Sequence, residues 1–174
     1  MKQAGSTIRL YTQLINSETE EVVKSFQLEG LYKEENIFHL IDSLSIMVKN
    51  FLIISKLEKE SPFYLQDFPS TTSPEAFRYY LYGEKARNNR DYPSARNMFL
   101  NALAIDSNFT LATLMLSVAC TNQGDYAEAR KWSILAYEKR DQMPIKQRIL
   151  TNKNHAFFFE TPYEELKYLR QYLH

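Results

Sequence analysis

The sequence predicts a mainly helical protein in which a short β-hairpin and a long amphipathic helix precede antiparallel helical hairpins. Three observations support this prediction. Polar and apolar residues alternate over Thr7–Ile15, apolar residues recur at three- and four-residue steps over Lys33–Ile54, and the sequence after Pro74 repeats itself at a fixed interval. Alternation is the period of a half-buried strand, and steps of three and four are the period of a helix with one apolar face.

The composition is that of a soluble globular protein with one core of ordinary size. The 174 residues are 44% hydrophobic and 24% charged, which excludes wholesale disorder. Lys plus Arg and Asp plus Glu both number 21, so no net field attracts nucleic acid or anionic lipid. The single cysteine, Cys120, excludes an internal disulfide. We expect no signal peptide, no apolar stretch long enough to span a membrane, and a cytoplasmic location.

The first element expected is a β-hairpin. Its strands are Thr7–Ile15 and Val22–Leu28, and the polar segment Asn16–Glu20 forms the turn between them. An isolated hairpin is marginally stable in water. Another element or another chain must therefore cover its apolar face.

A long amphipathic helix over Lys33–Ile54 is expected next. The segment Glu60–Ser73 then breaks the periodicity with two prolines and a Ser-Thr-Thr-Ser cluster. We place a boundary near Ser70, which divides the chain into a hairpin-and-helix region, 1–69, and a region of helical repeats, 70–174.

The repeats begin where Ser73 can cap a helix and Pro74 occupies its first position. Further on, Asn89–Arg96 aligns with Gln123–Arg130 at an offset of 34, since 123 minus 89 is 34. A period of 34 residues is that of a helix–turn–helix repeat.

The first unit resembles the tetratricopeptide (TPR) consensus. Its matching residues are Tyr79, Tyr82, Gly83, Ala86, Ala95, Phe99 and Ala102. The second unit departs from that consensus at Thr113, Ser117, Cys120 and Ser133. A third, degenerate unit starts at Pro144 and turns at Glu160–Pro162, about two residues out of register. The resemblance implies an α-α superhelix.

A wider resemblance covers most of the chain. Ile8–Ile15 and Thr72–Phe77 are similar to the end of a bacterial TolB-like amino-terminal domain and the start of the TPR units that follow it. This resemblance implies a regulatory or sensing region, part of a larger regulator, and a periplasmic location if that regulator is membrane-anchored.

The TPR resemblance implies that the first helix of each unit lines a groove for a protein or peptide partner. The residues expected there are Phe77, Tyr80, Glu84, Arg87, Asn88, Leu111, Leu114, Val118, Thr121, Asn122, Arg148, Asn152 and His155. Leu111–Thr121 is apolar nearly all round, so something should cover it. Either a partner peptide or the chain's own Lys33–Ile54 helix could do so.

Other functions have less support in the sequence. We expect no enzyme activity, no metal and no cofactor, because the histidines are far apart and no nucleophile–base pair or glycine-rich loop is evident. Arginine and lysine beside aromatic residues, as in Phe77–Tyr80, leave single-stranded nucleic-acid binding as an alternative, and an unrecognised enzyme activity is the other alternative. The neutral charge favours core packing instead. A homodimer could form through the hairpin or an exposed repeat face.

Overall fold

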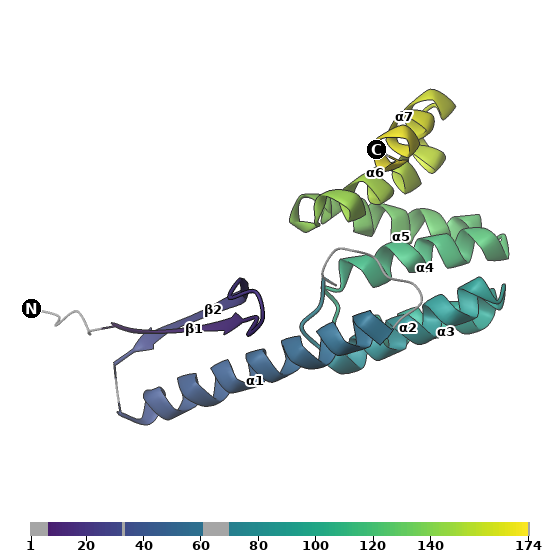
Figure 1. The fold of residues 1–174 in the computed structure, drawn as a ribbon. Coiled ribbons are helices and arrows are strands. Elements are labelled where there is room, and N and C mark those ends of the chain that lie inside the picture. The colour runs from purple at the N-terminus through teal and green to yellow at the C-terminus, as the bar shows by residue number, and fades with distance from the viewer. Residues whose placement is uncertain (1–6, 33, 61–69, 174) are drawn as a thin grey trace, which may run out of the picture. The chain divides into compact units, whose positions relative to one another are not determined.

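A computed structural model describes residues 7–32, 34–60 and 70–173 (Figure 1). The chain forms two compact units, residues 1–53 and 54–174, and their boundary lies inside a helix. The predicted fold class, mainly helical with an initial β-hairpin and a long helix, is confirmed. The elements are β1 (Thr7–Ile15), β2 (Val22–Leu31), α1 (Glu34–Glu60), α2 (Pro74–Asn88), α3 (Tyr92–Ile105), α4 (Thr110–Gln123), α5 (Tyr126–Glu138), the 3-10 turn η1 (Arg140–Gln142), α6 (Ile145–Phe159) and α7 (Pro162–Leu173).

The first unit consists of the hairpin and the part of α1 up to Ile53. Strands β1 and β2 pair antiparallel, with Arg9 opposite Glu29, and the Arg9 Nε donates a hydrogen bond to the Glu29 carboxylate at 2.7 Å. The even-numbered residues of β1 are half-buried while the odd-numbered ones are exposed. Phe26 of β2 meets Phe51 of α1 edge to face, with 5.7 Å between ring centroids. One face of the hairpin thus lies on the helix, as its alternation predicts.

Helix α1 ends six residues beyond the expected Ile54, at Glu60. Its segment Asn36–Glu60 is long and apolar enough to cross a membrane, and it is the one helix among the described residues that meets both criteria. Length and composition alone are weak support for a span, because core helices of soluble proteins share them. By length and composition, α1 is therefore an exception to the expectation that every apolar stretch is too short to span a membrane.

The last turns of α1 belong to the second unit. Ile54 is 5% exposed and lies in the same hydrophobic core as the helical repeats, and Leu57 packs against that core. The two compact units divide within α1, between Ile53 and Ile54. The connector expected over Glu60–Ser73 falls mostly on residues 61–69, which lie outside the described residues.

The second unit contains three successive helical hairpins, α2–α3, α4–α5 and α6–α7 (Figure 1). Side chains cap α2, α3 and α5 as local rules require. Ser73 Oγ accepts a hydrogen bond from the Ala76 N–H at 3.2 Å, as predicted for the start of α2. Asp91 and Asp125 do the same for α3 and α5 through the N–H groups three residues later. The turns between paired helices thus follow directly from the 34-residue repeat.

Close approach of α2 and α3 depends on Gly83. A Cβ at this position would lie 2.5 Å from the Phe99 ring, which is far inside van der Waals contact. Phe99 is fully buried, and so are Ala95 and Ala102 on the same face of α3. The small Gly83 on α2 and the large Phe99 ring on α3 thus fit together across this helical hairpin.

Acid should weaken the cap of α3. The Ser94 hydroxyl and N–H hold the pKa of the Asp91 carboxyl below its ordinary value of 3.8. A carboxylate whose pKa is lowered by folding stabilises the fold above its unfolded pKa and loses that contribution as the pH falls through the folded pKa. We therefore expect Asp91→Asn to lose less stability than the parent between about pH 6 and about pH 2. Urea midpoints at the two pH values measure this, and equal losses in both proteins would contradict it.

Candidate functional site

A groove of about 240 Å³ lies between α4 and α6, with α7 at one end. A larger hollow of about 540 Å³ lies in the hairpin unit. The residues that line the groove are Leu114, Met115, Val118, Thr121, Asn122, Leu150, Lys153, Asn154, Phe157 and Glu165. Two successive helical hairpins therefore contribute their first helices to one concave surface.

Ser117 fixes the spacing of the helices beneath this groove. Its Oγ lies 2.8 Å from the Ala129 carbonyl of α5 and 3.0 Å from the side-chain amide of Asn154 on α6. The hydroxyl has one hydrogen, which it can donate to either acceptor, the Ala129 carbonyl oxygen or Asn154 Oδ1. A fully buried hydroxyl that is satisfied from two helices holds α4, α5 and α6 in one arrangement.

The floor of the groove is apolar. Leu114 is almost fully buried, whereas Met115, Val118 and Leu150 are half-buried and Phe157 is 49% exposed. Burying such side chains beneath a ligand gains about 25 cal/mol for each Å² of apolar area. The floor can therefore bind apolar side chains of a partner.

Polar groups border this floor. The Thr121 hydroxyl donates to the Ser117 carbonyl at 2.9 Å. Lys153 Nζ lies 3.6 Å from the Glu165 carboxylate, and both side chains are about one-third exposed. Asn122 is exposed. Because Lys153 and Glu165 carry opposite charges and pair with each other, they add no net charge to the border. The side-chain amide of Asn122 can both donate hydrogen bonds to a peptide backbone and accept them from it.

Most of the expected residues on α2 do not reach a concave surface. Phe77, Tyr80 and Glu84 are 3%, 3% and 4% exposed, and the Phe77 and Tyr80 rings stack at 5.8 Å. Burial raises the pKa of the Tyr80 hydroxyl well above its ordinary value of 10.0, and the nearby Glu84 carboxylate adds to this effect. Phe77 and Tyr80 belong to the hydrophobic core together with Ile54 of α1, and Glu84 is a buried charged residue.

The remaining expected residues of α2 lie near its end. The Arg87 guanidinium donates to both oxygens of the Glu84 carboxylate, at 2.9 and 2.8 Å. Asn88 is exposed. A bidentate pair of this kind compensates the buried carboxylate, so Arg87 has a structural role.

Helix α4 carries the expected residues that do meet in the groove. Leu114, Val118, Thr121 and Asn122 all line it. Leu111 does not, because it is buried and its N–H donates to the Ser70 Oγ at 3.0 Å. The prediction for this helix thus identified the side that faces α6.

On α6 the groove is lined by residues that sequence reasoning missed. Arg148, Asn152 and His155 are not among the lining residues. The His155 ring instead stacks on Tyr137 of α5, with 3.8 Å between centroids, and its Nδ1 lies 3.4 Å from the Glu160 carboxylate. The residues that do line the groove are Leu150, Lys153, Asn154 and Phe157.

The residues expected on α6 were misplaced because the repeat period changes between the second and the third unit. Asp125 caps α5, and Thr161 Oγ1 accepts from the Glu164 N–H at 3.4 Å near the start of α7; 161 minus 125 is 36, not 34. The connection between α5 and α6 covers 139–144, whereas that between α3 and α4 covers 106–109. Two additional residues there shift the register, and the late turn at Glu160–Pro162 was the signal for it.

Metal-ligating and nucleophilic groups are the next candidates for a site. The described residues contain no group of three or more His, Cys, Asp or Glu side chains arranged to hold a metal ion. Burial raises the pKa of the Cys120 thiol above its ordinary value of 9.0, which disfavours the nucleophilic thiolate.

No family model matches the chain, and neither the curated proteins nor the solved structures contain a significant match to it.

Proposed function

We propose that this chain is a non-catalytic protein-interaction module of the TPR kind, which binds a peptide segment or partner helix in the groove between α4 and α6. The observation that carries the proposal is the groove itself, in which half-exposed apolar side chains from two successive hairpins face one hollow. The 34-residue offset and the side-chain caps at Asp91 and Asp125 support the repeat interpretation. A cytoplasmic adaptor or a regulatory region of a larger protein would both use such a module.

The chemistry of the groove defines the partner. Val118, Leu150 and Phe157 favour a segment with apolar anchors spaced three or four residues apart, as on one face of a helix. Met115 adds an adaptable contact, because its unbranched side chain can follow different partner shapes. Since Lys153 and Glu165 neutralise each other, binding should depend weakly on salt.

The test uses selection of peptides on the full chain. A displayed random peptide library should yield binders with apolar anchors, and a labelled binder is then titrated by fluorescence anisotropy. Val118→Glu places a charge on the apolar floor, so we expect its affinity to fall at least about tenfold, since each tenfold loss corresponds to about 1.4 kcal/mol. Raising the salt concentration should change the affinity little.

A matched control is Ile134→Glu. Ile134 is 42% exposed on α5 and is not a lining residue of the groove, so this variant introduces the same charge elsewhere. We expect it to bind like the parent. If no peptide is enriched, or if both variants bind selected peptides equally well, the groove is not the binding site.

A further inference from the structure

The hairpin unit has an apolar trough of about 540 Å³ along one side of α1. Thr12 of β1 is its one contribution from the hairpin, so the trough lies on the β1 side. Its other lining residues come from α1 and are Leu44, Ser45, Val48, Lys49, Leu52 and Ile53. The α1 side chains beside β1 thus form an apolar surface that the two strands of the hairpin leave uncovered.

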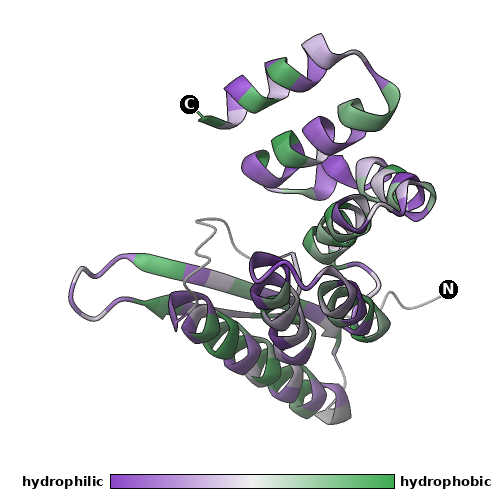
Figure 2. Cartoon of the chain, turned by 90° about the vertical axis from the view of Figure 1, so that its right-hand side faces the viewer, coloured by the Kyte–Doolittle hydropathy of each residue, from purple (hydrophilic) through white to green (hydrophobic). Residues whose placement is uncertain are grey.

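Exposed apolar side chains extend this surface. Ile41 is 45% exposed and Leu52 is 52% exposed. Together with Ser45 and Val48 they form one stripe, because positions i, i+4, i+7 and i+11 share a helix face. Figure 2 shows how apolar residues continue along α1. A neighbouring side of α1, about a quarter turn from the stripe, contacts β2, where Leu40 approaches Gly30 and Phe51 meets Phe26.

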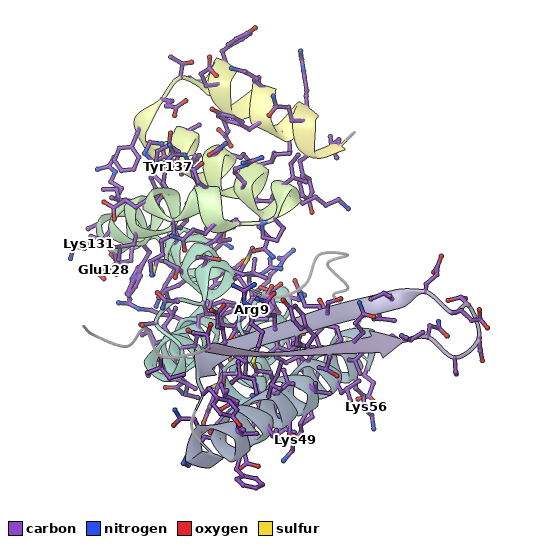
Figure 3. The ribbon with its side chains drawn as sticks, turned by 90° about the vertical axis from the view of Figure 1, so that its left-hand side faces the viewer. Arg9, Lys49, Lys56, Glu128, Lys131 and Tyr137 are labelled. Carbon is purple, nitrogen blue, oxygen red and sulfur yellow. The ribbon has the colours of Figure 1, made fainter. Side chains whose placement is uncertain are left out.

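The two edges of the hairpin differ in their protection against further strand pairing. Strand β2 carries Lys24 on its helix-facing side, with Nζ 6.0 Å from the centroid of the Phe51 ring. An inward-pointing charge of this kind discourages pairing at a sheet edge. In β1 the one charged residue is Arg9, which Glu29 already binds, and Figure 3 shows it on the hairpin. The edge beside the trough is therefore the one open to another strand.

We propose that a second copy of this chain occupies this edge, with the two β1 strands pairing antiparallel about a twofold axis. Pairing all nine residues of Thr7–Ile15 places the axis at Tyr11, the midpoint of the strand. In this register even-numbered residues face even-numbered ones, so the half-buried face of each β1 stays on the helix side. Arg9 then faces Gln13 of the second copy, and no like charges meet.

The spacing of the helices fits this pairing. Strands lie about 4.8 Å apart, and each copy contributes two strands beneath one helix. The two α1 helices would therefore lie about 9.6 Å apart, which is within the 8–10 Å of packed helices. The uncovered stripe of each α1 meets the other across the axis, and Ser45, a small residue, allows close approach in the middle.

Charges beside the stripe are complementary. Asp42 and Lys49 lie seven residues apart on the same flank of α1, which is the spacing of two helical turns. Antiparallel helices bring equal flanks together, so this flank meets the same flank of the other copy and supplies opposite charges to it. The resulting assembly is a four-stranded sheet covered on one face by two helices.

The first test is the mass of the full chain in solution. At about 100 µM, well above the micromolar range of ordinary weak dimers, light scattering should report twice the 20.5 kDa of one chain. Leu52→Glu should give a monomer, with dimerisation weakened at least about tenfold. The matched control is Ile46→Glu, since Ile46 is 57% exposed but lies on the opposite side of α1 from the stripe. It should remain dimeric.

The second test does not depend on a destabilising variant. Tyr11→Cys should form a disulfide between copies on mild oxidation, because the axis brings the two positions within the 4.4–6.8 Å that a disulfide requires between Cα atoms. Gln27 lies directly opposite Tyr11 in β2. Gln27→Cys should not cross-link, because three strand spacings, about 14 Å, separate the two copies of this position.

Three results would overturn the proposal. One is a monomeric parent chain, including one that binds phosphatidylcholine vesicles as a monomer, since lipid would then cover α1. Another is a dimer that survives Leu52→Glu. The third is cross-linking through Gln27→Cys in place of Tyr11→Cys, which would assign the contact to the β2 edge.

Discussion

Replacing Phe99 by alanine should destabilise the helical repeats by about 3–5 kcal/mol, the range for removal of a buried aromatic ring. Phe99 is fully buried, its ring lies 5.8 Å from that of Tyr80, and it fills the space above Gly83. Neighbouring side chains cannot fill the cavity that Phe99→Ala would leave, because Ala95 and Ala102 beside it are already small. A loss of this size is a large part of the stability of an ordinary domain.

The measurement is urea unfolding followed through the fluorescence of Trp132. This is the single tryptophan of the chain, and it packs against the core of the second unit, so it reports on that unit alone. Phe157→Ala is the matched control, because the same ring is 49% exposed on α6 and should cost less than about 1 kcal/mol. Equal losses from the two substitutions would show that Phe99 is not the centre of this core.

Replacing Gly83 by alanine should also destabilise the repeats, although alanine is the better helix former. Alanine gains about 0.5–1 kcal/mol over glycine within a helix. Its Cβ, however, would lie 2.5, 2.7 and 2.9 Å from three atoms of the Phe99 ring, and an overpacked core costs about 1–3 kcal/mol. We expect the clash to exceed the gain, with a net loss of stability in the same urea assay.

A second substitution separates the clash from other causes. In a Phe99→Leu background the ring atoms are absent, so Gly83→Ala should cost much less than in the parent chain. Gly124→Ala is the control for a backbone effect, because Gly124 has a φ of +86° and open space around its Cβ position. Its cost should be the same with or without Phe99→Leu. Equal costs of Gly83→Ala in both backgrounds would exclude the steric explanation.

Local rules predicted the elements of this fold well. Alternation gave Thr7–Ile15 with the bounds observed for β1, and the cap at Ser73 and the turn before Tyr126 follow from side chains within three residues of each helix start. These features depend on the identity of neighbouring residues. A single sequence contains that information directly.

Tertiary packing limited how many residues of the candidate site could be predicted from the sequence. The groove positions on α4 could be predicted, because α4 follows the 34-residue period. Phe77 and Tyr80 could not be placed correctly, because Ile54 and Leu57 from the end of α1 share their core. Helical periodicity marks the apolar side of α1, but it does not say which of its turns belong to which unit.

The six-residue connection 139–144 also limits how this protein can be engineered. Two positions along a helix correspond to a rotation of about 200° around its axis. A designer who replaced α6 and α7 by a regular copy of the preceding pair, keeping the long connection, would turn the intended contact side chains nearly to the back of the helix. Recognition sequences that are grafted onto α6 must therefore be aligned by counting back from Thr161. When repeat units are exchanged, the connection should be exchanged together with the helices that it joins.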